Sequence, residues 1–456
     1  MIDVKNKVNS FFIFNSNLGP KEGDELKRIL FYYPSDTSPN NRKTQVGLCE
    51  AVVKFMTTFT PEPCEALQTQ TKRYIFYQPE KDFWLVLTFL YLLQVVRIPY
   101  ATKALSATGE KKELVEPSVM YDLLASAYKM FKMFFGPLSE IPVDEVYDKC
   151  EHFFGPYIAN KNVSNEVTNI IQGIYYLPLQ KNSFFNVVCF IDLLEINFPQ
   201  FKCVSFVYND QLIWNGLTTD DMLTLYQYLV QTLLPKLVEK EIQGGAVTAA
   251  QRHGRFISPP DGIRTKEDLL KLNKVYLTLE DQTEAKYYYL VIYRTLSATV
   301  TFTVDVDTAL DIDTFRSLDT FIGPQLSTIA SSIGEECTIQ ALQNAQINHS
   351  DHKFIYFNRL NLAFKTSSPP SLTPSTAIKP EVLSIIAGIH ADKKSLGDFG
   401  EVIIKTPDEY WITGKSSNDR EFYVVIYKKN ANLKEIADEV KRICEAQMKG
   451  IFFYPM

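Results

Sequence analysis

Strand-like and helix-like segments alternate along the whole chain, and the order in which they alternate recurs. Aromatic runs at residues 11–14 and 29–33, separated by a Gly-, Pro- and charge-containing stretch, predict a hairpin or meander. Five further segments follow, at residues 44–59 (helix), 74–77 and 83–96 (strands), and 118–135 and 143–154 (helices). The order β-β-α-β-β(-β)-α-α predicts a unit of roughly 160 residues in which helices pack on a sheet.

The same order is repeated twice more. Strand patterns at 203–208 and 211–214 flank Asn209-Asp210, which predicts a two-residue hairpin loop. The chain has 456 residues, and a length of about 150 residues per domain predicts about three domains. We therefore divide the chain into residues 1–160, 161–348 and 349–456.

The helix predicted at residues 44–59 carries more apolar surface than one sheet requires. Two adjacent stripes cover an arc of about 180°, whereas packing on a single sheet needs only about 100°. The first stripe contains Leu48, Val52, Phe55, Met56 and Phe59, and the second contains Val46, Cys49 and Val53. Either a neighbouring element of the same chain covers part of this helix, or the helix packs on its own sheet and also meets a partner.

Two helices are predicted to stop at the same sequence. Residues 134–137 and 153–156 both read Phe-Phe-Gly-Pro. A glycine followed by a proline is typical of a left-handed helix cap and a helix end.

Charge, cysteine spacing and the N-terminal residues argue against a nucleic-acid-binding, a zinc-binding or a secreted protein. With 47 Lys+Arg against 53 Asp+Glu the net charge is −6, so we expect no nucleic-acid partner. Seven cysteines without a CxxC pair predict a reducing, cytoplasmic setting and no zinc site. Residues 1–10 lack the apolar core of a signal peptide. Residues 83–96 are almost wholly apolar but, as a helix, would span only about 21 Å of a roughly 30 Å bilayer core, so we expect a buried strand or strand pair.

No motif for catalysis, metal binding or cofactor binding is complete. Residues 414–416 read Gly-Lys-Ser, but Glu409 stands where a phosphate loop needs glycine, so we expect a hairpin turn there. Residues 305–313 hold four aspartates without the glycine of a calcium loop. His349 and His352 have no cysteine or third histidine nearby in the sequence. We therefore expect no catalytic residue, metal or cofactor, and no covalent enzyme chemistry.

One basic cluster stands out in the second unit. Arg252, His253, Arg255 and Arg264 lie in a long loop rich in Gly and Pro. Such a cluster is typical of a segment that faces an anionic membrane, where each cation contributes about 1 kcal/mol. A solvated loop is the alternative, and we predict Arg252, Arg255 and Arg264 as membrane-facing residues.

Eight short segments, spread over nearly the whole chain, are similar to segments of one known protein family. They are residues 11–15 (FFIFN), 18–23 (LGPKEG), 29–34 (ILFYYP), 46–51 (VGLCEA), 206–217 (FVYNDQLIWNGL), 322–326 (IGPQL), 354–358 (FIYFN) and 429–433 (KNANL). Together they resemble the calcium-caffeine-zinc sensitivity family of vacuolar fusion proteins, commonly written Ccz-one. One departure is residues 89–94, which look like extra sequence between the residue 83–84 strand and the family's Val-Val-Arg-x-Pro segment.

The resemblance implies an α/β protein, an α+β sandwich of three longin domains, each a mainly antiparallel sheet flanked by helices. It also implies a guanine-nucleotide exchange factor formed with the monensin-sensitivity protein and acting on the late-endosomal and vacuolar Rab GTPase (the Rab-seven class). Animals add a third regulatory subunit, and the complex is expected peripherally on late endosomes, lysosomes and autophagosomes. The alternative is a longin-type trafficking adaptor or scaffold that does not catalyse exchange.

The resemblance gives the wide apolar arc a reason. In the family, the first longin domains of both partners form a joint platform for the GTPase. We predict that the first stripe, including Leu48, Val52, Phe55 and Phe59, packs on its own sheet. The residues predicted to bind the partner are Val46, Cys49 and Val53, and those predicted to face the GTPase are Glu50, Lys54 and Thr57.

Overall fold

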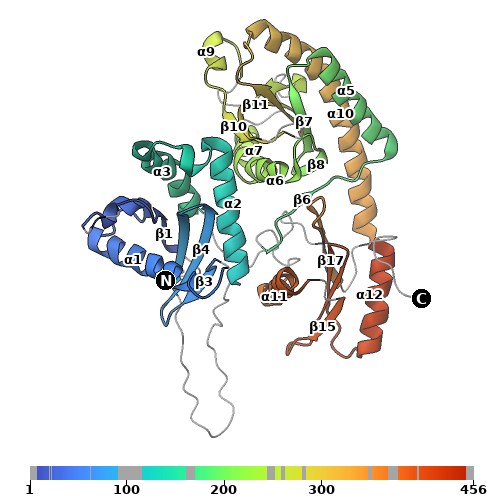
Figure 1. Cartoon of the computed structure of the whole chain (residues 1–456). Helices are drawn as coiled ribbons and strands as arrows, with labels where there is room; N and C mark the ends of the chain where they lie inside the picture. The colour runs from blue at the N-terminus through green and yellow to red at the C-terminus, as the bar shows by residue number, and fades with distance from the viewer. Residues whose placement is uncertain are drawn as a thin grey trace. The chain divides into compact units, whose positions relative to one another are not determined.

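The computed structural model describes residues 8–19, 21, 23–61, 63–90, 116–160, 170–243, 252–257, 262–279, 284–347, 352–367, 378–397 and 400–447. The chain divides into two compact units, residues 1–170 with 379–391, and residues 171–378 with 392–456. Three mainly antiparallel sheets carry helices (Figure 1), which confirms the predicted helix–sheet class. The boundaries predicted after residues 160 and 348 stay predictions. In the described ranges, no helix has both the length and the apolar character that a membrane crossing requires.

The first sheet lies between helices on both of its faces. Its elements are β1 (Val8–Asn15), η1 (Glu25–Arg28), β2 (Ile29–Tyr33), α1 (Pro39–Met56), β3 (Ala66–Gln68), β4 (Lys72–Glu80), β5 (Phe83–Leu90), α2 (Pro117–Phe135), η2 (Leu138–Glu140) and α3 (Val143–Asn160). The strand order is β2-β1-β5-β4-β3. Phe12 and Phe14 of β1 pack with α1, whereas the ring of Phe11 lies 5.0 Å from that of Phe154 in α3. Alternate side chains of one strand thus enter two cores, so its sequence is continuously apolar.

Strand β5 bears on two predictions. It begins at Phe83, as predicted, and is buried along most of its length. Residues 91–96 of the predicted strand, and with them most of the extra segment at 89–94, lie outside the described residues.

The two predicted helix stops behave differently. Helix α2 ends at Phe135, and Gly136 adopts a φ of 79° while its N–H donates to the Lys132 carbonyl, which confirms the first stop. The second stop is wrong, because α3 continues through Gly155 and Pro156 to Asn160. Proline removes only one helix hydrogen bond, and the buried Phe154 holds this turn against the sheet through ring contacts with Phe11 and Phe31.

The second sheet carries α5 and α10 on one face. Its elements are α5 (Lys181–Asn197), β7 (Lys202–Tyr208), β8 (Gln211–Trp214), α6 (Thr219–Tyr228), η3 (Leu229–Leu233), α7 (Leu234–Gln243), β9 (Arg255–Phe256), α9 (Lys266–Leu269), β10 (Lys274–Leu277), β11 (Lys286–Thr295), β12 (Ala298–Asp305) and α10 (Ile312–Ile347). The main strand order is β10-β11-β12-β7-β8, and β9 pairs with β11. Asn209 has a φ of 54° in the loop between β7 and β8, which confirms the predicted hairpin.

The third sheet carries α12 on one face. Its elements are β13 (His352–Asn358), β14 (Ala363–Thr366), α11 (Pro380–Leu396), β15 (Glu401–Lys405), β16 (Trp411–Ser417), β17 (Arg420–Ile426) and α12 (Leu433–Gln447). The strand order is β15-β16-β17-β13-β14-β6, in which β6 is Ile174–Tyr175. The turn predicted at residues 414–416 is wrong, since these residues lie inside β16. The chain turns instead at Asn418 and Asp419, whose φ angles are 50° and 59°.

A short linker strand, β6 (Ile174–Tyr175), joins the second and third sheets within one compact unit. It pairs in parallel with β14, and the neighbouring Tyr176 forms a bridge with Leu212 of β8. The backbone N–H of Ile174 donates to the Leu362 carbonyl at 2.7 Å, and that of Leu177 donates to the Leu212 carbonyl at 2.9 Å. The linker therefore hydrogen-bonds to an edge of each sheet.

Gly173 permits this close approach, and its replacement by alanine should weaken the join. A Cβ atom at this position would lie 2.5 Å from Cβ of Phe364 and 3.0 Å from the Leu362 carbonyl oxygen. Because backbone atoms must shift, we expect Gly173→Ala to lower the free energy of unfolding by about 1–3 kcal/mol. Urea unfolding measures this change. Gly388→Ala, where no atom lies within 4 Å of the added Cβ, is the matched control and should cost nothing.

Candidate functional site

Helix α1 has a well-defined start. The Ser38 hydroxyl accepts a hydrogen bond from the Asn41 N–H at 3.4 Å, and Pro39 occupies the first helical position. A serine cap satisfies a backbone N–H that the helix leaves unpaired, and proline fits this position because its own N–H is not needed. These residues fix where the helix begins.

The inner face of α1 consists of Val46, Cys49 and Val53. All three side chains are buried, and they pack in one cluster with aromatic residues of the first sheet, among them Phe12 and Phe76. Burial raises the pKa of the Cys49 thiol to about 12, so this cysteine is neutral at physiological pH. The prediction that these three residues approach a partner protein is therefore wrong, because their surface is already occupied by the chain's own core.

The opposite side of α1 is apolar and exposed. We name Leu48, Ala51 and Phe55 of the helix, with Phe59 just after it, the α1 outer face. Phe55 is 62% exposed and Phe59 73% exposed, and their ring centroids lie 4.8 Å apart. The prediction that Leu48, Phe55 and Phe59 pack on the sheet is wrong, whereas Val52 at the margin is partly buried. The wide arc is real, but the half predicted to pack on the sheet is exposed and the half predicted to meet a partner is buried.

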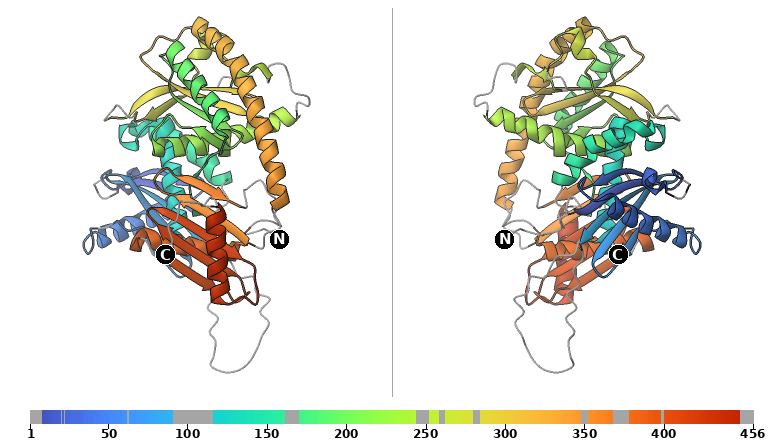
Figure 2. Two further views of the ribbon diagram at one scale, coloured as in Figure 1. Left: turned by 90° about the vertical axis from the view of Figure 1, so that its right-hand side faces the viewer. Right: turned by 90° about the vertical axis from the view of Figure 1, so that its left-hand side faces the viewer.

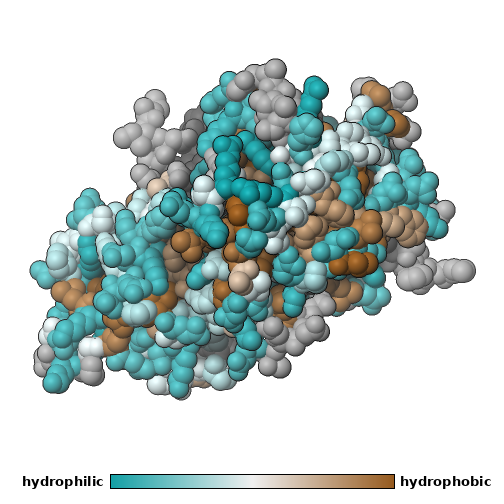
Figure 3. Space-filling view, turned by 90° about the horizontal axis from the view of Figure 1, so that it is seen from above, coloured by the Kyte–Doolittle hydropathy of each residue, from teal (hydrophilic) through white to brown (hydrophobic). Residues whose placement is uncertain are grey.

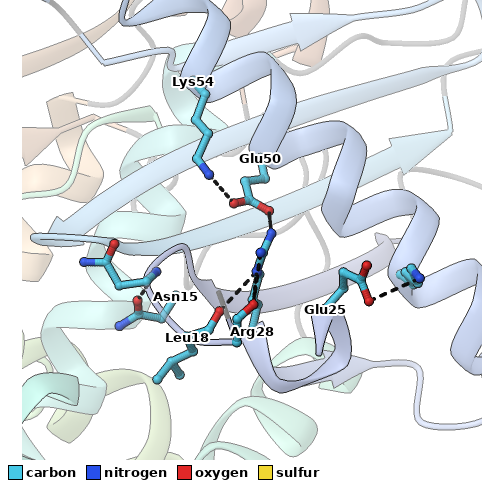
Figure 4. A network of polar contacts seen from close by, with 9 residues as sticks. Asn15, Leu18, Glu25, Arg28, Glu50 and Lys54 are labelled. Carbon is cyan, nitrogen blue, oxygen red and sulfur yellow. Dashed lines mark hydrogen bonds and ion pairs between the residues drawn. The ribbon is translucent and has the colours of Figure 1, made fainter. Parts of the chain in front are cut away.

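A buried ion pair marks one margin of α1 (Figure 4). The Glu50 carboxylate lies 2.7 Å from Nη1 of Arg28 and 2.6 Å from Nζ of Lys54. The same Arg28 donates to the carbonyl oxygens of Leu18 and Gly19 at 3.0–3.2 Å. Burial acts to raise the pKa of Glu50, but hydrogen bonds from Lys54 and Arg28 bring it below its usual value. Glu50 therefore fastens the loop after β1 to α1, and only 7% of it is exposed.

The other two residues predicted to face the GTPase are exposed. The Lys54 side chain is largely in solvent although its ammonium group contacts Glu50. Thr57 follows the end of α1, and its hydroxyl donates to the Lys54 carbonyl at 2.8 Å. Lys54 and Thr57 thus lie close together and are accessible to a second protein, whereas Glu50 is buried and contacts Lys54.

The predicted membrane-facing arginines are not equivalent. Arg255 lies 3.2 Å from the carboxylate of Glu241, which is also 3.5 Å from the buried Arg294. Arg252 and Arg264 are exposed. Glu241 thus neutralises part of the basic cluster. The membrane-facing role of the three arginines stays a prediction.

Comparison with known proteins identifies the lineage of the chain. It is 36% identical over 464 residues to the "Vacuolar fusion protein CCZ1 homolog" of Xenopus tropicalis, covering 97% of this chain and 96% of the relative. The homologue of Nematostella vectensis is 37% identical, with 97% of each chain covered. The chain belongs to the CCZ1 family. The homologue of Dictyostelium discoideum is 26% identical over 98% of both chains, so the similarity to CCZ1 proteins extends across the whole length.

Family models confirm the three longin domains of this CCZ1-family chain. Residues 8–136 match the "First Longin domain of INTU, CCZ1 and HPS4". Residues 201–323 match "Intu longin-like domain 2", and residues 348–443 match "Intu longin-like domain 3". The α1 outer face and the Arg28–Glu50 pair therefore belong to the first longin domain of the CCZ1 fold.

Sequence reasoning missed Arg28 and inverted the faces of α1. Arg28 and Glu50 are 22 positions apart, so no helical or strand periodicity connects them. A signal was nevertheless present, because Glu50 lies next to Val46 and Val53 on a helical wheel. A carboxylate at the margin of a buried stripe predicts a cationic partner.

Proposed function

We propose that this chain is one subunit of a guanine-nucleotide exchange factor for a Rab GTPase of the Rab-seven class, with the monensin-sensitivity protein as the other subunit. The observation that carries the proposal is the α1 outer face, which is apolar and exposed on a first longin domain of the CCZ1 family. Exposed aromatic side chains of this size are typical of a protein-binding surface. We assign this face to the partner subunit, in place of Val46, Cys49 and Val53.

Exchange of this kind needs binding, not covalent chemistry. A protein that binds the nucleotide-free GTPase more tightly than the nucleotide-bound form weakens nucleotide binding by the same factor. The joint platform would draw the first switch loop away from the nucleotide and disturb Mg²⁺, which requires near-ideal octahedral geometry. On this proposal the chain is not an enzyme in the covalent sense. Lys54 and Thr57 lie beside the partner-binding face, where they would contact the GTPase.

The cellular setting is part of the same proposal. We infer a role in vacuolar and late-endosomal trafficking, lysosome fusion and autophagy, supported by the name carried by the relatives. The complex would be recruited peripherally to an anionic or phosphoinositide-bearing membrane, with Arg252 and Arg264 as the exposed cations. In an animal, a third regulatory subunit would join it.

Release of a fluorescent nucleotide from the Rab tests the proposed activity. We expect acceleration when both subunits are present, and little or none with this chain alone or its partner alone. If the complex binds the GTP form preferentially and does not accelerate release, the chain is an adaptor and the exchange proposal fails. A Rab of another class is the specificity control.

Replacing Lys54 with alanine should slow exchange without weakening the subunit complex. Its ammonium group is exposed beside the α1 outer face, so its removal deletes a charge that the GTPase would meet. Removing one interfacial charge of this kind is expected to lower the exchange rate about threefold to thirtyfold, corresponding to about 0.7–2 kcal/mol. Lys43→Ala is the control, since Lys43 lies on the same helix and pairs with Glu25 at 3.2 Å. Equal rates for both variants would remove Lys54 from the GTPase contact.

A further inference from the structure

Helix α5 of the second longin domain has a second apolar face that the sheet does not use. Its inner face, Val187, Phe190, Ile191 and Leu194, is buried in the core with α10, and the two helices lie side by side (Figure 2). The opposite side carries Phe185, Cys189, Leu193 and Ile196, which we name the α5 stripe. Ile196 is 75% exposed, and Phe185 and Leu193 are about half exposed.

The spacing of the α5 stripe fits a helical ligand. Residues at i, i+4, i+8 and i+11 form one continuous line on a helix, about 17 Å long between Phe185 and Ile196. A solvent-facing helix surface is ordinarily polar, and the face of the molecule drawn in Figure 3 is a largely hydrophilic surface interrupted by apolar patches. Four non-polar side chains in one line form a surface that an amphipathic helix recognises.

The charges beside the stripe specify the ligand further. Asp192 and Glu195 flank Leu193 and Ile196, and neither forms an ion pair with any residue in the described part of the chain. Burial, and then the nearby charge of Asp192, raises the pKa of Glu195. The last turn of α5 also lacks a basic residue. The partial negative charge at the C-terminal end of the helix therefore adds to the negative charge of the two carboxylates. The C-terminal half of the stripe is therefore apolar and negatively charged, with no cation of its own.

We propose that the α5 stripe binds an amphipathic helix of another polypeptide whose lysines or arginines lie against Asp192 and Glu195. An anionic membrane does not fit, because both acids would be repelled from it. A second copy of this chain fits poorly, because α5 offers only Lys181, which lies at its opposite end over the Phe185 ring. The proposal goes beyond nucleotide exchange, since this surface is on a different domain from the α1 outer face.

Two matched peptides test the proposal. Each is a designed helix of about 18 residues with leucines at i, i+4, i+7 and i+11; one carries lysines beside the leucines and the other glutamates. Fluorescence anisotropy measures their binding to the full chain, together with its partner subunit if the chain requires one. We expect the lysine peptide to bind at least about tenfold more tightly than the glutamate peptide. Equal binding of the two peptides overturns the proposal.

Variants of the chain assign the binding to this surface. Asp192→Lys with Glu195→Lys should reverse the preference between the peptides, and Ile196→Asp should weaken binding of the lysine peptide at least about tenfold. Leu360→Asp, at a leucine that is also exposed, is the control and should change nothing. An unchanged preference after charge reversal overturns the proposal. The proposal is also overturned if the chain binds phosphatidylserine vesicles and Ile196→Asp abolishes that binding. It is likewise overturned if the chain self-associates and Ile196→Asp abolishes the self-association. Nucleotide release tests the exchange proposal, and peptide binding tests the α5 stripe. Failure of one proposal therefore does not decide the other.

Discussion

A chain carrying Phe55→Asp and Phe59→Asp is expected to lose its partner subunit and, with it, stimulated nucleotide release. The two rings are exposed in this chain and lie 4.8 Å apart, so a partner that covers them would bury one continuous aromatic surface. Burying a phenylalanine side chain contributes about 1.5–3 kcal/mol. Two aspartates would remove that contribution and place charges in an apolar contact, which predicts an affinity loss of about 10²-fold to 10⁴-fold.

Size-exclusion chromatography of the co-expressed subunits and fluorescent-nucleotide release measure this loss. The fold should survive, because both side chains are in solvent and the inner face of α1 is unchanged. Leu270→Asp is the matched control, since Leu270 is 84% exposed but belongs to the second longin domain. An intact complex with unchanged exchange would show that the partner does not bind through the α1 outer face.

The conservative change Cys49→Ala should separate the two faces of α1. Cys49 is fully buried under the helix, so the cavity left by its sulfur is expected to reduce stability while leaving partner affinity unchanged. Loss of partner affinity without loss of stability would return the partner-binding role to the inner face, as first predicted from the sequence.

The arrangement of strands and helices was predictable because local patterns and tertiary packing agree. Phe11 and Phe12 enter cores on opposite faces of the first sheet, and this two-sided burial is what makes the strand a continuous apolar run. At Asn209 the left-handed backbone that the hairpin requires suits asparagine. In such segments the local preference of the residues and the tertiary packing favour the same backbone conformation.

The roles of the two halves of α1 were not predictable from periodicity. Both halves are apolar, and a helical wheel has no information on which of them the sheet covers. The half that the sheet covers carries Glu50 at its margin, and the partner of this carboxylate, Arg28, meets it only in the folded chain. The helix stop predicted at Gly155 failed for a related reason, since the burial of Phe154 outweighs the local preference of Gly-Pro.

A buried charge cluster in the third longin domain was also not predictable from the sequence, because its members are far apart in the chain and meet only in the fold. We expect this cluster to be sensitive to substitution. Glu421 of β17 is fully buried. Its carboxylate accepts hydrogen bonds from Nε of Arg359 at 2.9 Å and from the hydroxyl of Tyr423 at 2.5 Å, and lies 3.7 Å from Nζ of Lys393. These three partners come from the end of β13, from β17 and from α11, so one carboxylate connects three elements.

Replacing Glu421 with glutamine is expected to destabilise this domain by about 3–5 kcal/mol, the usual cost of breaking a buried ion pair. The Lys393 side chain is only 4% exposed and its Nζ lies 3.7 Å from this carboxylate, so the substitution would remove a negative charge from beside a buried cation. The three tryptophans, Trp84, Trp214 and Trp411, lie one in each longin domain. Fluorescence of Trp411 in a Trp84→Phe, Trp214→Phe background therefore reports urea unfolding of the third domain.

Two comparisons distinguish lost charge pairing from a general effect of substitution. Glu409→Gln removes an exposed pair with Lys429 at 3.2 Å, and a surface pair contributes only about 0–1 kcal/mol. Adding Lys393→Met to Glu421→Gln removes the buried cation that faced the carboxylate, so the double variant should recover part of the lost stability. If Glu421→Gln unfolds at the same urea concentration as Glu409→Gln, the cluster does not hold the domain together. If Lys393→Met fails to restore stability, the cost arises from packing around Glu421 and not from the buried charge.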